Sequence, residues 1–145
     1  MPITDTQEIT RWLTRTKVIA IVGLSPKTDR PSHAVAQFLL VRGYDIIPVN
    51  PACKEMLGRP CYPDLALIPR AVDMVDVFRK AEDVLPIAQE AIRIGAKCLW
   101  LQLGVINPQA VALAEAAGLA VVEDRCLKIE YTQRFGLQPV GGLSV

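Results

Sequence analysis

The sequence predicts an α/β fold, specifically a Rossmann-like three-layer sandwich with a mostly parallel sheet of five or six strands. Short apolar runs rich in valine, isoleucine and leucine alternate with segments of helical periodicity. Strands joined through helices need crossover connections, which make neighbouring strands parallel. With 145 residues, 51% of them hydrophobic, the chain can enclose one core. We therefore predict a single domain over 1–145, with a helix in 1–16, the core in 17–135 and a tail in 136–145.

A short helix is predicted before the first strand. Asp5 and Glu8 have the spacing of a capping box, and Ile9, Trp12 and Leu13 then share one helical face. This helix should cover part of the core.

The first strand, loop and helix follow directly. Residues 17–23 (KVIAIVG) form a continuous apolar run that ends in glycine, which is typical of a strand buried on both faces. A loop over 24–31 leads to a helix that we expect Ser32 to cap and Gly43 to end. Its core-facing positions are Val35, Phe38 and Leu39.

The same alternation continues to the end of the chain. Pro48 indicates that the second strand lies near an edge of the sheet, because proline cannot donate a ladder hydrogen bond. The proline-rich segment 52–70 is predicted to hold a short strand and an irregular helical turn. The predicted strands are 44–49, 60–62, 71–78, 97–103 and 119–122, and the predicted helices are 82–94, 108–117 and 125–135.

Composition excludes several classes of function. Sixteen basic and fifteen acidic residues give a net charge of +1, too small for a nucleic-acid surface. No apolar run approaches the roughly 18–20 residues of a membrane span, and the polar N-terminus does not resemble a secretory signal. The four cysteines lack the close spacing of zinc or redox sites. We expect a cytoplasmic protein with free thiols and no metal.

Ligands of such sheets bind outside the carboxyl ends of the strands. Four segments fall there: 23–31, 50–54, 78–80 and 103–107. Function is therefore expected at this edge of the sheet.

The first of these segments has the donors of an anion site. Gly23 allows close backbone approach, although the three-glycine dinucleotide fingerprint is missing. Lys27, Arg30 and Ser32, together with the start of the following helix, could bind a pyrophosphate. Asp29 offers an alternative, in which Arg30 pairs with it in solvent.

The second strand argues against ordinary NAD. An NAD site places a carboxylate after this strand to hold the ribose hydroxyls, and here the residue is Asn50. Lys54 is either a solvated surface lysine or a partner for the ribose phosphate of NADP or coenzyme A.

Five motifs in order carry a family resemblance. They are VGLSPK at 22–27, PVNP at 48–51, VFR at 77–79, WLQLG at 100–104 and DRCL at 124–127. From about residue 16 to 131, the chain resembles the stand-alone CoA-binding domain family, which is similar to the N-terminal domain of the succinyl-CoA synthetase α subunit.

The resemblance implies a Rossmann-like domain that holds coenzyme A, or an acyl-CoA, across its strand ends. At matching positions, the resemblance implies ligand contacts in three loops and a glycine turn. Cys126 corresponds to a cysteine of the synthetase. The implied contacts are Gly23, Leu24, Ser25, Asn50, Pro51, the residues to Lys54, Phe78, Arg79, Gln102 and Gly104. The first loop has less glycine than the synthetase, and the phosphohistidine domain does not follow. We therefore expect binding without chemistry.

Other interpretations remain open. An NAD(P)-dependent oxidoreductase or sensor, or an accessory subunit of an acyl-CoA synthetase, fits the same pattern, and the protein could form a homodimer. His33 is expected to be a solvated first-turn residue, with a phosphate contact as the alternative. Asp73 and Asp76 should point to opposite faces and so cannot act as an acid–base pair. Cys126 is a hypothetical site for a mixed disulfide with coenzyme A.

Overall fold

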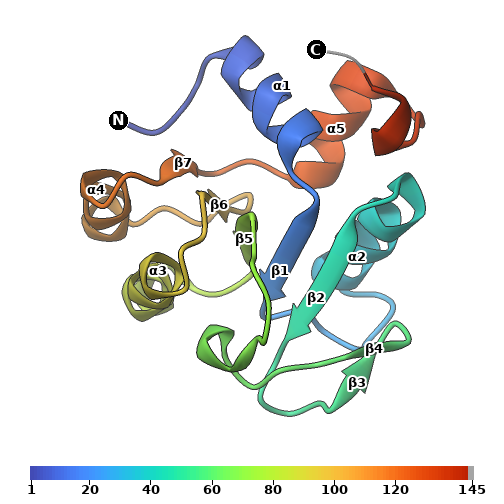
Figure 1. Cartoon of the computed structure of the whole chain (residues 1–145), viewed down its shortest axis with the longest axis horizontal. Helices are drawn as coiled ribbons and strands as arrows, with labels where there is room; N and C mark the ends of the chain where they lie inside the picture. Colours follow the sequence, from blue (N-terminus) through green and yellow to red (C-terminus); the bar gives the residue numbers. More distant parts are fainter. Residues whose placement is uncertain (144–145) are drawn as a thin grey trace.

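The computed structural model describes residues 1–143 and shows a five-stranded parallel sheet between two layers of helices (Figure 1). The predicted fold class is confirmed, with five strands in the main sheet. The strands of this sheet are β1 (Val18–Val22), β2 (Asp45–Val49), β5 (Met74–Val77), β6 (Cys98–Leu101) and β7 (Ala120–Val122). The α-helices are α1 (Thr6–Arg15), α2 (Pro31–Arg42), α3 (Val84–Arg93), α4 (Pro108–Ala116) and α5 (Leu127–Phe135).

The strand order is β2-β1-β5-β6-β7, and every neighbouring pair is parallel. From β1 the chain steps outward to β2, and it then returns to β5 on the other side of β1. The order therefore reverses between β1 and β5, at the topological switch point where ligands of such sheets bind. Val22 of β1 is in register with Val49 of β2 and with Val77 of β5, so these three strands end together.

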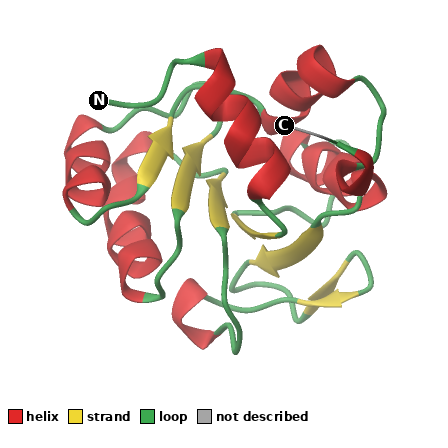
Figure 2. Cartoon of the chain, turned by 45° about the horizontal axis from the view of Figure 1, so that its top comes forward, coloured by secondary structure: helices red, strands yellow, loops and turns green. Residues whose placement is uncertain are grey.

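Each face of the sheet has its own apolar layer. Along β1, Ile19 and Ile21 face α1, α2 and α5, whereas Ala20 and Val22 face α3 and α4. Because side chains alternate along a strand, a continuous apolar run is required when both faces are covered. Figure 2 shows the helices on both sides of the strands.

Most helix boundaries follow the predicted signals, with one exception at α2. Asp5 accepts a hydrogen bond from the Gln7 amide and caps α1, and Gly43 ends α2 in the left-handed region with φ of 108°. The predicted cap by Ser32 is wrong: the N-cap is Arg30, and α2 begins at Pro31. Proline favours this first helical position because its φ is already helical.

The proline-rich segment contains more regular structure than predicted. The strands β3 (Glu55–Met56) and β4 (Arg59–Pro60) form an antiparallel hairpin, and η1 (Leu65–Leu67) is the expected irregular turn. The Tyr62 amide then donates to the Pro48 carbonyl, 3.0 Å away, on the outer edge of β2. Pro48 therefore lies on an edge strand, as predicted.

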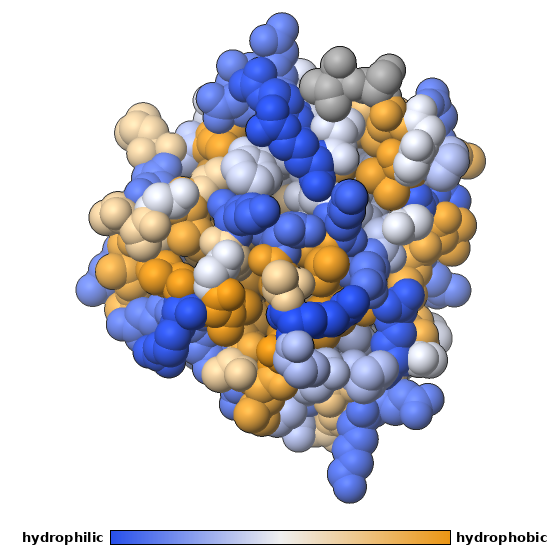
Figure 3. Space-filling model, in the orientation of Figure 1, coloured by the Kyte–Doolittle hydropathy of each residue, from blue (hydrophilic) through white to orange (hydrophobic). Residues whose placement is uncertain are grey.

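The predicted tail contains a short 3-10 turn, η3 (Val140–Gly142), and its last two residues lie outside the described part. Another 3-10 turn, η2 (Ala81–Asp83), precedes α3. No helix of residues 1–143 is long and apolar enough to cross a membrane. On the face drawn in Figure 3, apolar side chains form several groups separated by polar ones.

Candidate functional site

The carboxyl ends of β1 and β5 approach each other closely at Gly23. Its φ is +84°, and a Cβ atom built there would lie 2.3 Å from the Phe78 carbonyl oxygen and 2.9 Å from Cδ of Arg79. The Phe78 amide also donates to the Val22 carbonyl. Glycine is needed here because the backbone after β5 occupies the space of a side chain.

A network of short hydrogen bonds fixes the loop after β1. The Ser25 amide donates to Oγ of Ser32, 2.9 Å away, and Oγ of Ser25 accepts from the Lys27 amide at 3.1 Å. Nδ1 of His33 lies 3.1 Å from the Ser25 carbonyl oxygen. The loop is therefore tied to the first turn of α2. The expectation that His33 is solvated is wrong, because only 8% of it is exposed.

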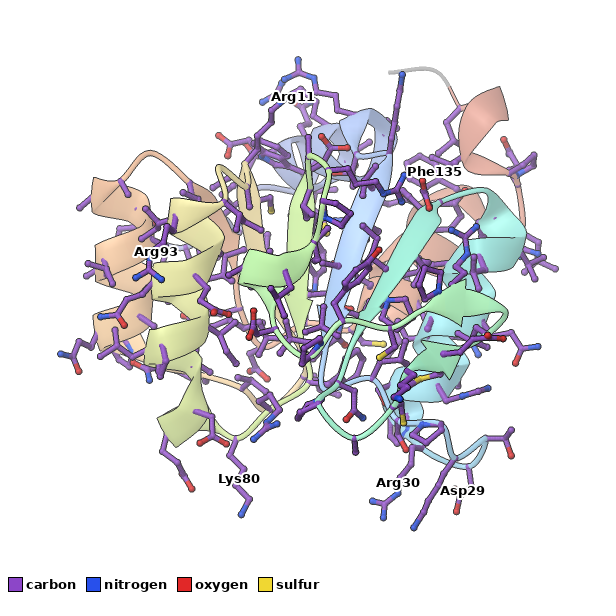
Figure 4. All side chains as sticks on the ribbon, turned by 60° about the horizontal axis from the view of Figure 1, so that its bottom comes forward. Arg11, Asp29, Arg30, Lys80, Arg93 and Phe135 are labelled. Carbon is purple, nitrogen blue, oxygen red and sulfur yellow. The ribbon has the colours of Figure 1, made fainter. Side chains whose placement is uncertain are left out.

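Exposed cations lie at this end of the molecule. Figure 4 shows Arg30 and Lys80 extending from the same end, with Asp29 beside Arg30. Among residues 1–143, neither Arg30 nor Lys27 forms an ion pair, whereas Arg79 lies 3.4 Å from Asp83. A hollow of about 370 Å³ lies beside the loop. Its lining residues are Gly23, Ser25, Lys27, Arg30, Pro31, Ser32 and Phe78.

Asn50 is engaged by the protein's own backbone. Its Nδ2 donates to the Leu24 carbonyl at 2.9 Å, and its Oδ1 accepts from the Ala52 amide at 2.8 Å. Leu24 itself is fully buried, so its side chain belongs to the core. Lys54 is exposed on the segment before the hairpin. Asn50 therefore fixes the loops after β1 and β2 relative to each other.

We expect Asn50→Ala to lower the free energy of unfolding by about 1 kcal/mol, because the partly buried Leu24 carbonyl loses its partner, whereas the exposed Ala52 amide can bind water instead. Urea unfolding measures this change. Asn50→Asp is the matched variant, since it keeps the acceptor for Ala52 and loses only the donor to Leu24. An alanine variant as stable as the native protein would contradict this role.

The main cavity of the candidate site, about 810 Å³, lies between α2, α5 and the ends of β5 and β6. It shares Pro31 and Phe78 with the hollow beside the first loop, so the two are adjacent. Its walls are mainly apolar, with a group of charged residues on one side. The lining residues are Pro31, Val35, Phe78, Arg79, Lys80, Glu82, Asp83, Gln102, Leu103, Val105, Cys126 and Ile129.

A buried carboxyl lies below one wall of this cavity. Asp76 has no exposed surface, and its Oδ1 accepts from Nε2 of Gln102 at 2.7 Å. Its Oδ2 has no hydrogen-bond partner among the described residues. Burial raises the pKa of Asp76 to about 8, and the Gln102 hydrogen bond only partly opposes this. Asp73 instead accepts from the Lys17 and Val18 amides before the sheet.

The turn after β6 is closed by Asp124. The Gly104 amide donates to Oδ1 of Asp124 at 2.6 Å, and Gly104 has a φ of +84°. Arg125 lies 3.2 Å from Glu130, so its salt bridge is with the helix rather than with Asp124. Cys126 is the N-cap of α5 and lines the main cavity.

A third hollow, about 310 Å³, lies on the α3 side of Gly23. Pro51 and Leu65 contribute apolar surface to it, and Arg79 and Asp83 are shared with the main cavity. Asp64 also lines it, and its buried Oδ1 has no hydrogen-bond partner among the described residues.

The candidate site combines residues predicted from the sequence with wall residues that were not predicted. The structure brings the residues of the first loop and those after β5 together around Gly23, and Gln102 into the adjacent cavity. Four of the predicted site residues line none of these hollows: Leu24, Asn50, Lys54 and Gly104. Val35 and Ile129 were not predicted as site residues, because their helical spacing indicates only a packing face. Within residues 1–143, no cluster of three or more His, Cys, Asp or Glu side chains is arranged to bind a metal.

Comparison with known proteins finds one matching family model and several similar proteins. Residues 17–132 match a family model described as a CoA binding domain. The uncharacterized protein YneT of Bacillus subtilis is 39% identical over 124 residues, which are 86% of this chain and 92% of that protein. Acetate–CoA ligase (ADP-forming) I of Archaeoglobus fulgidus is 28% identical over 127 residues, 81% of this chain but 18% of the ligase. A solved hypothetical protein from Pyrococcus horikoshii OT3 has a TM-score of 0.88 and 41% identity, with coverage of 92% of this chain and 95% of that one.

Proposed function

The chain belongs to the CoA-binding domain family, and on that premise we propose that it binds coenzyme A or an acyl-CoA along the rim at the carboxyl ends of its strands. The observation that carries the proposal is the pairing of two adjacent hollows. One has exposed cations and a rigid serine loop, and the other is large and mainly apolar. Coenzyme A has the matching chemistry, since its phosphorylated adenosine is joined through a diphosphate to a flexible pantetheine arm.

The phosphates are assigned to the hollow beside the first loop. Lys27 and Arg30 supply positive charge there, and the first turn of α2 adds the positive end of its dipole. The serine network supports this assignment because it holds the loop in place before any ligand arrives, which lowers the entropy lost on binding.

The adenosine is assigned to the hollow on the α3 side of Gly23. Pro51 and Leu65 provide apolar contact for a base, and the carboxylate of Asp64, which lines the same hollow, can accept a hydrogen bond from an amino group. The pantetheine arm then extends in the opposite direction, past Phe78 into the main cavity. Gln102 there offers an amide to the amides of the arm.

We propose binding without chemical turnover. The single histidine is buried and directed at the Ser25 carbonyl, and Arg79 pairs with Asp83 beside the cavity. These contacts leave no histidine to activate a nucleophile in the cavity. Acetyl-CoA incubated with the protein should be recovered intact by chromatography, and its hydrolysis would contradict this point.

Calorimetric titration tests the binding itself. We expect coenzyme A to bind with a dissociation constant below about 100 μM, roughly −5.5 kcal/mol, and NAD and NADP to bind much more weakly. Dephospho-CoA reports the contribution of the 3′-phosphate. Equal affinity for NAD and coenzyme A would favour the oxidoreductase interpretation instead.

Charge removal at the first loop should weaken binding. We expect Lys27→Ala and Arg30→Ala each to reduce the affinity for coenzyme A about 3- to 10-fold, because each removes a charged donor at a solvent-exposed site. The loss should shrink at high salt. Arg93→Ala is the matched control, since Arg93 is an exposed arginine on α3 that lines none of the three hollows. An equal loss in the Arg93 variant would argue against a phosphate site at this loop.

The similarity to the archaeal ligase supports a second candidate, an accessory subunit of an acyl-CoA synthetase. The chain spans only 18% of the length of that ligase, and this candidate assigns the catalytic steps to a partner chain. Purification of the native protein from its own cells tests this candidate, and co-elution of a chain with synthetase activity is the result it requires.

A further inference from the structure

An apolar surface continues beyond the proposed arm-binding cavity. Leu103, Ile106 and Ile129 are 65%, 48% and 46% exposed, which is high for large aliphatic side chains. They come from the turn after β6 and from α5, and all three line a fourth hollow of about 580 Å³. This hollow shares Leu103, Cys126 and Ile129 with the main cavity, so the two meet at these residues.

The N-terminal segment forms the outer wall of this fourth hollow. Residues Met1 to Thr4 line it, and the Ile3 amide donates to the Val121 carbonyl at 2.7 Å, next to the edge strand β7. The terminal amine of Met1 pairs with Glu115, which fastens the segment at its start. The result is a trough with two walls, unlike the flat surface that most protein partners need.

The charges of the trough are negative or already paired. Asp124 accepts from the Gly104 amide, and Glu130 pairs with Arg125 and Arg134. Glu123 also lines the trough, and its Oε2 has no hydrogen-bond partner among the described residues. A ligand group that carries its own carboxylate would be repelled here, whereas an uncharged chain would not.

We propose that this trough, lined by Leu103, Ile106 and Ile129, holds the acyl chain of an uncharged, medium-length acyl-CoA. The inference rests on the proposed function, because the pantetheine arm directs the thioester toward Cys126, where the two hollows meet. Apolar side chains that are exposed without a ligand then become covered by methylene groups. The negative charges of the trough disfavour dicarboxylic acyl groups.

Titration with coenzyme A, octanoyl-CoA and succinyl-CoA tests the proposal. Full burial of one methylene strengthens binding roughly fourfold, so two buried methylenes are enough for a gain of about tenfold. We expect octanoyl-CoA to bind at least about tenfold more tightly than coenzyme A, and succinyl-CoA to show no gain. If none of the three binds, the proposed function fails. If coenzyme A binds and octanoyl-CoA gains nothing, only the acyl-chain inference is overturned.

Variants of the trough residues test whether the gain in affinity for octanoyl-CoA arises there. The ratio of octanoyl-CoA to coenzyme A affinity should fall about threefold or more in Ile106→Gln and in Leu103→Gln. Leu67→Gln is the matched control, because Leu67 is 58% exposed on η1 and lines neither hollow. An unchanged ratio in both trough variants would overturn the assignment. Self-association that Ile106→Gln abolishes, without any octanoyl gain, would show that this face is a contact between copies and would also overturn it.

Discussion

Gly23→Ala should destabilise the protein by about 3 kcal/mol or more and abolish ligand binding at the rim. Two costs combine at this position. A β-carbon with φ of +84° is strained, at about 1–2 kcal/mol for residues other than glycine. The same atom would lie 2.3 Å from the Phe78 carbonyl oxygen, which is backbone and cannot rotate away. The ends of β1 and β5 would have to separate, and the walls of the adjacent hollows would move with them.

Gly95→Ala separates the two costs. Gly95 has φ of +78°, and nothing lies within 4 Å of a Cβ built there. Its substitution should therefore cost only the conformational strain, about 1–2 kcal/mol, and leave ligand affinity unchanged. Urea unfolding and calorimetry on both variants measure the difference. If Gly23→Ala is no worse than Gly95→Ala, the close approach of Phe78 does not matter for stability.

The main sheet was predictable because its strands are buried on both faces. A run such as KVIAIVG at 17–23 fits neither an amphipathic helix nor a half-exposed strand, so it identified β1. The short strand predicted at 60–62 overlaps β4 at Pro60, whereas its antiparallel partner β3 was not predicted, since two-residue strands have no measurable periodicity. The start of α2 was misassigned to Ser32, although Pro31 marks the first helical position.

The site was predictable only to the level of loops. Strand ends in a parallel sheet must meet at one edge, so the segments after β1 and β5 were expected to lie together. The sequence does not reveal which polar groups are already used: the amide of Asn50 and the hydroxyl of Ser32 are both occupied by backbone partners. The main cavity depends on how α2 packs beside α5, which is a tertiary property.

Asp76 is the other residue whose role emerges only in three dimensions. On β5 it lies in register with Ile21 and Trp100, and Gln102 supplies its only hydrogen bond among the described residues. Burial of a carboxyl is unfavourable once it ionises, so the folded protein holds its proton to about pH 8. The buried thiol of Cys98 also has a raised pKa, caused by its burial and by the nearby Asp76.

The stability of the native protein should therefore fall between pH 5.5 and pH 8. In this range the unfolded chain has lost the Asp76 proton and the folded protein keeps it, so each pH unit removes about 1.4 kcal/mol of stability. The fall should end above about pH 8, where both states are ionised. Asp45 does not contribute, because Arg70 and Arg59 outweigh its burial and lower its pKa.

Asp76→Asn should abolish this pH dependence. Asparagine keeps an acceptor for Nε2 of Gln102 and cannot ionise, so the advantage of the variant over the native protein should grow by about 3 kcal/mol from pH 5.5 to pH 8. Denaturant unfolding of both proteins across this range measures the difference directly. A difference that stays constant with pH would mean that Asp76 is already ionised in the folded state, and that water or a cation then reaches its Oδ2 below the ligand cavity. Because Gln102 lines that cavity, such access would open the wall proposed to bind pantetheine to solvent.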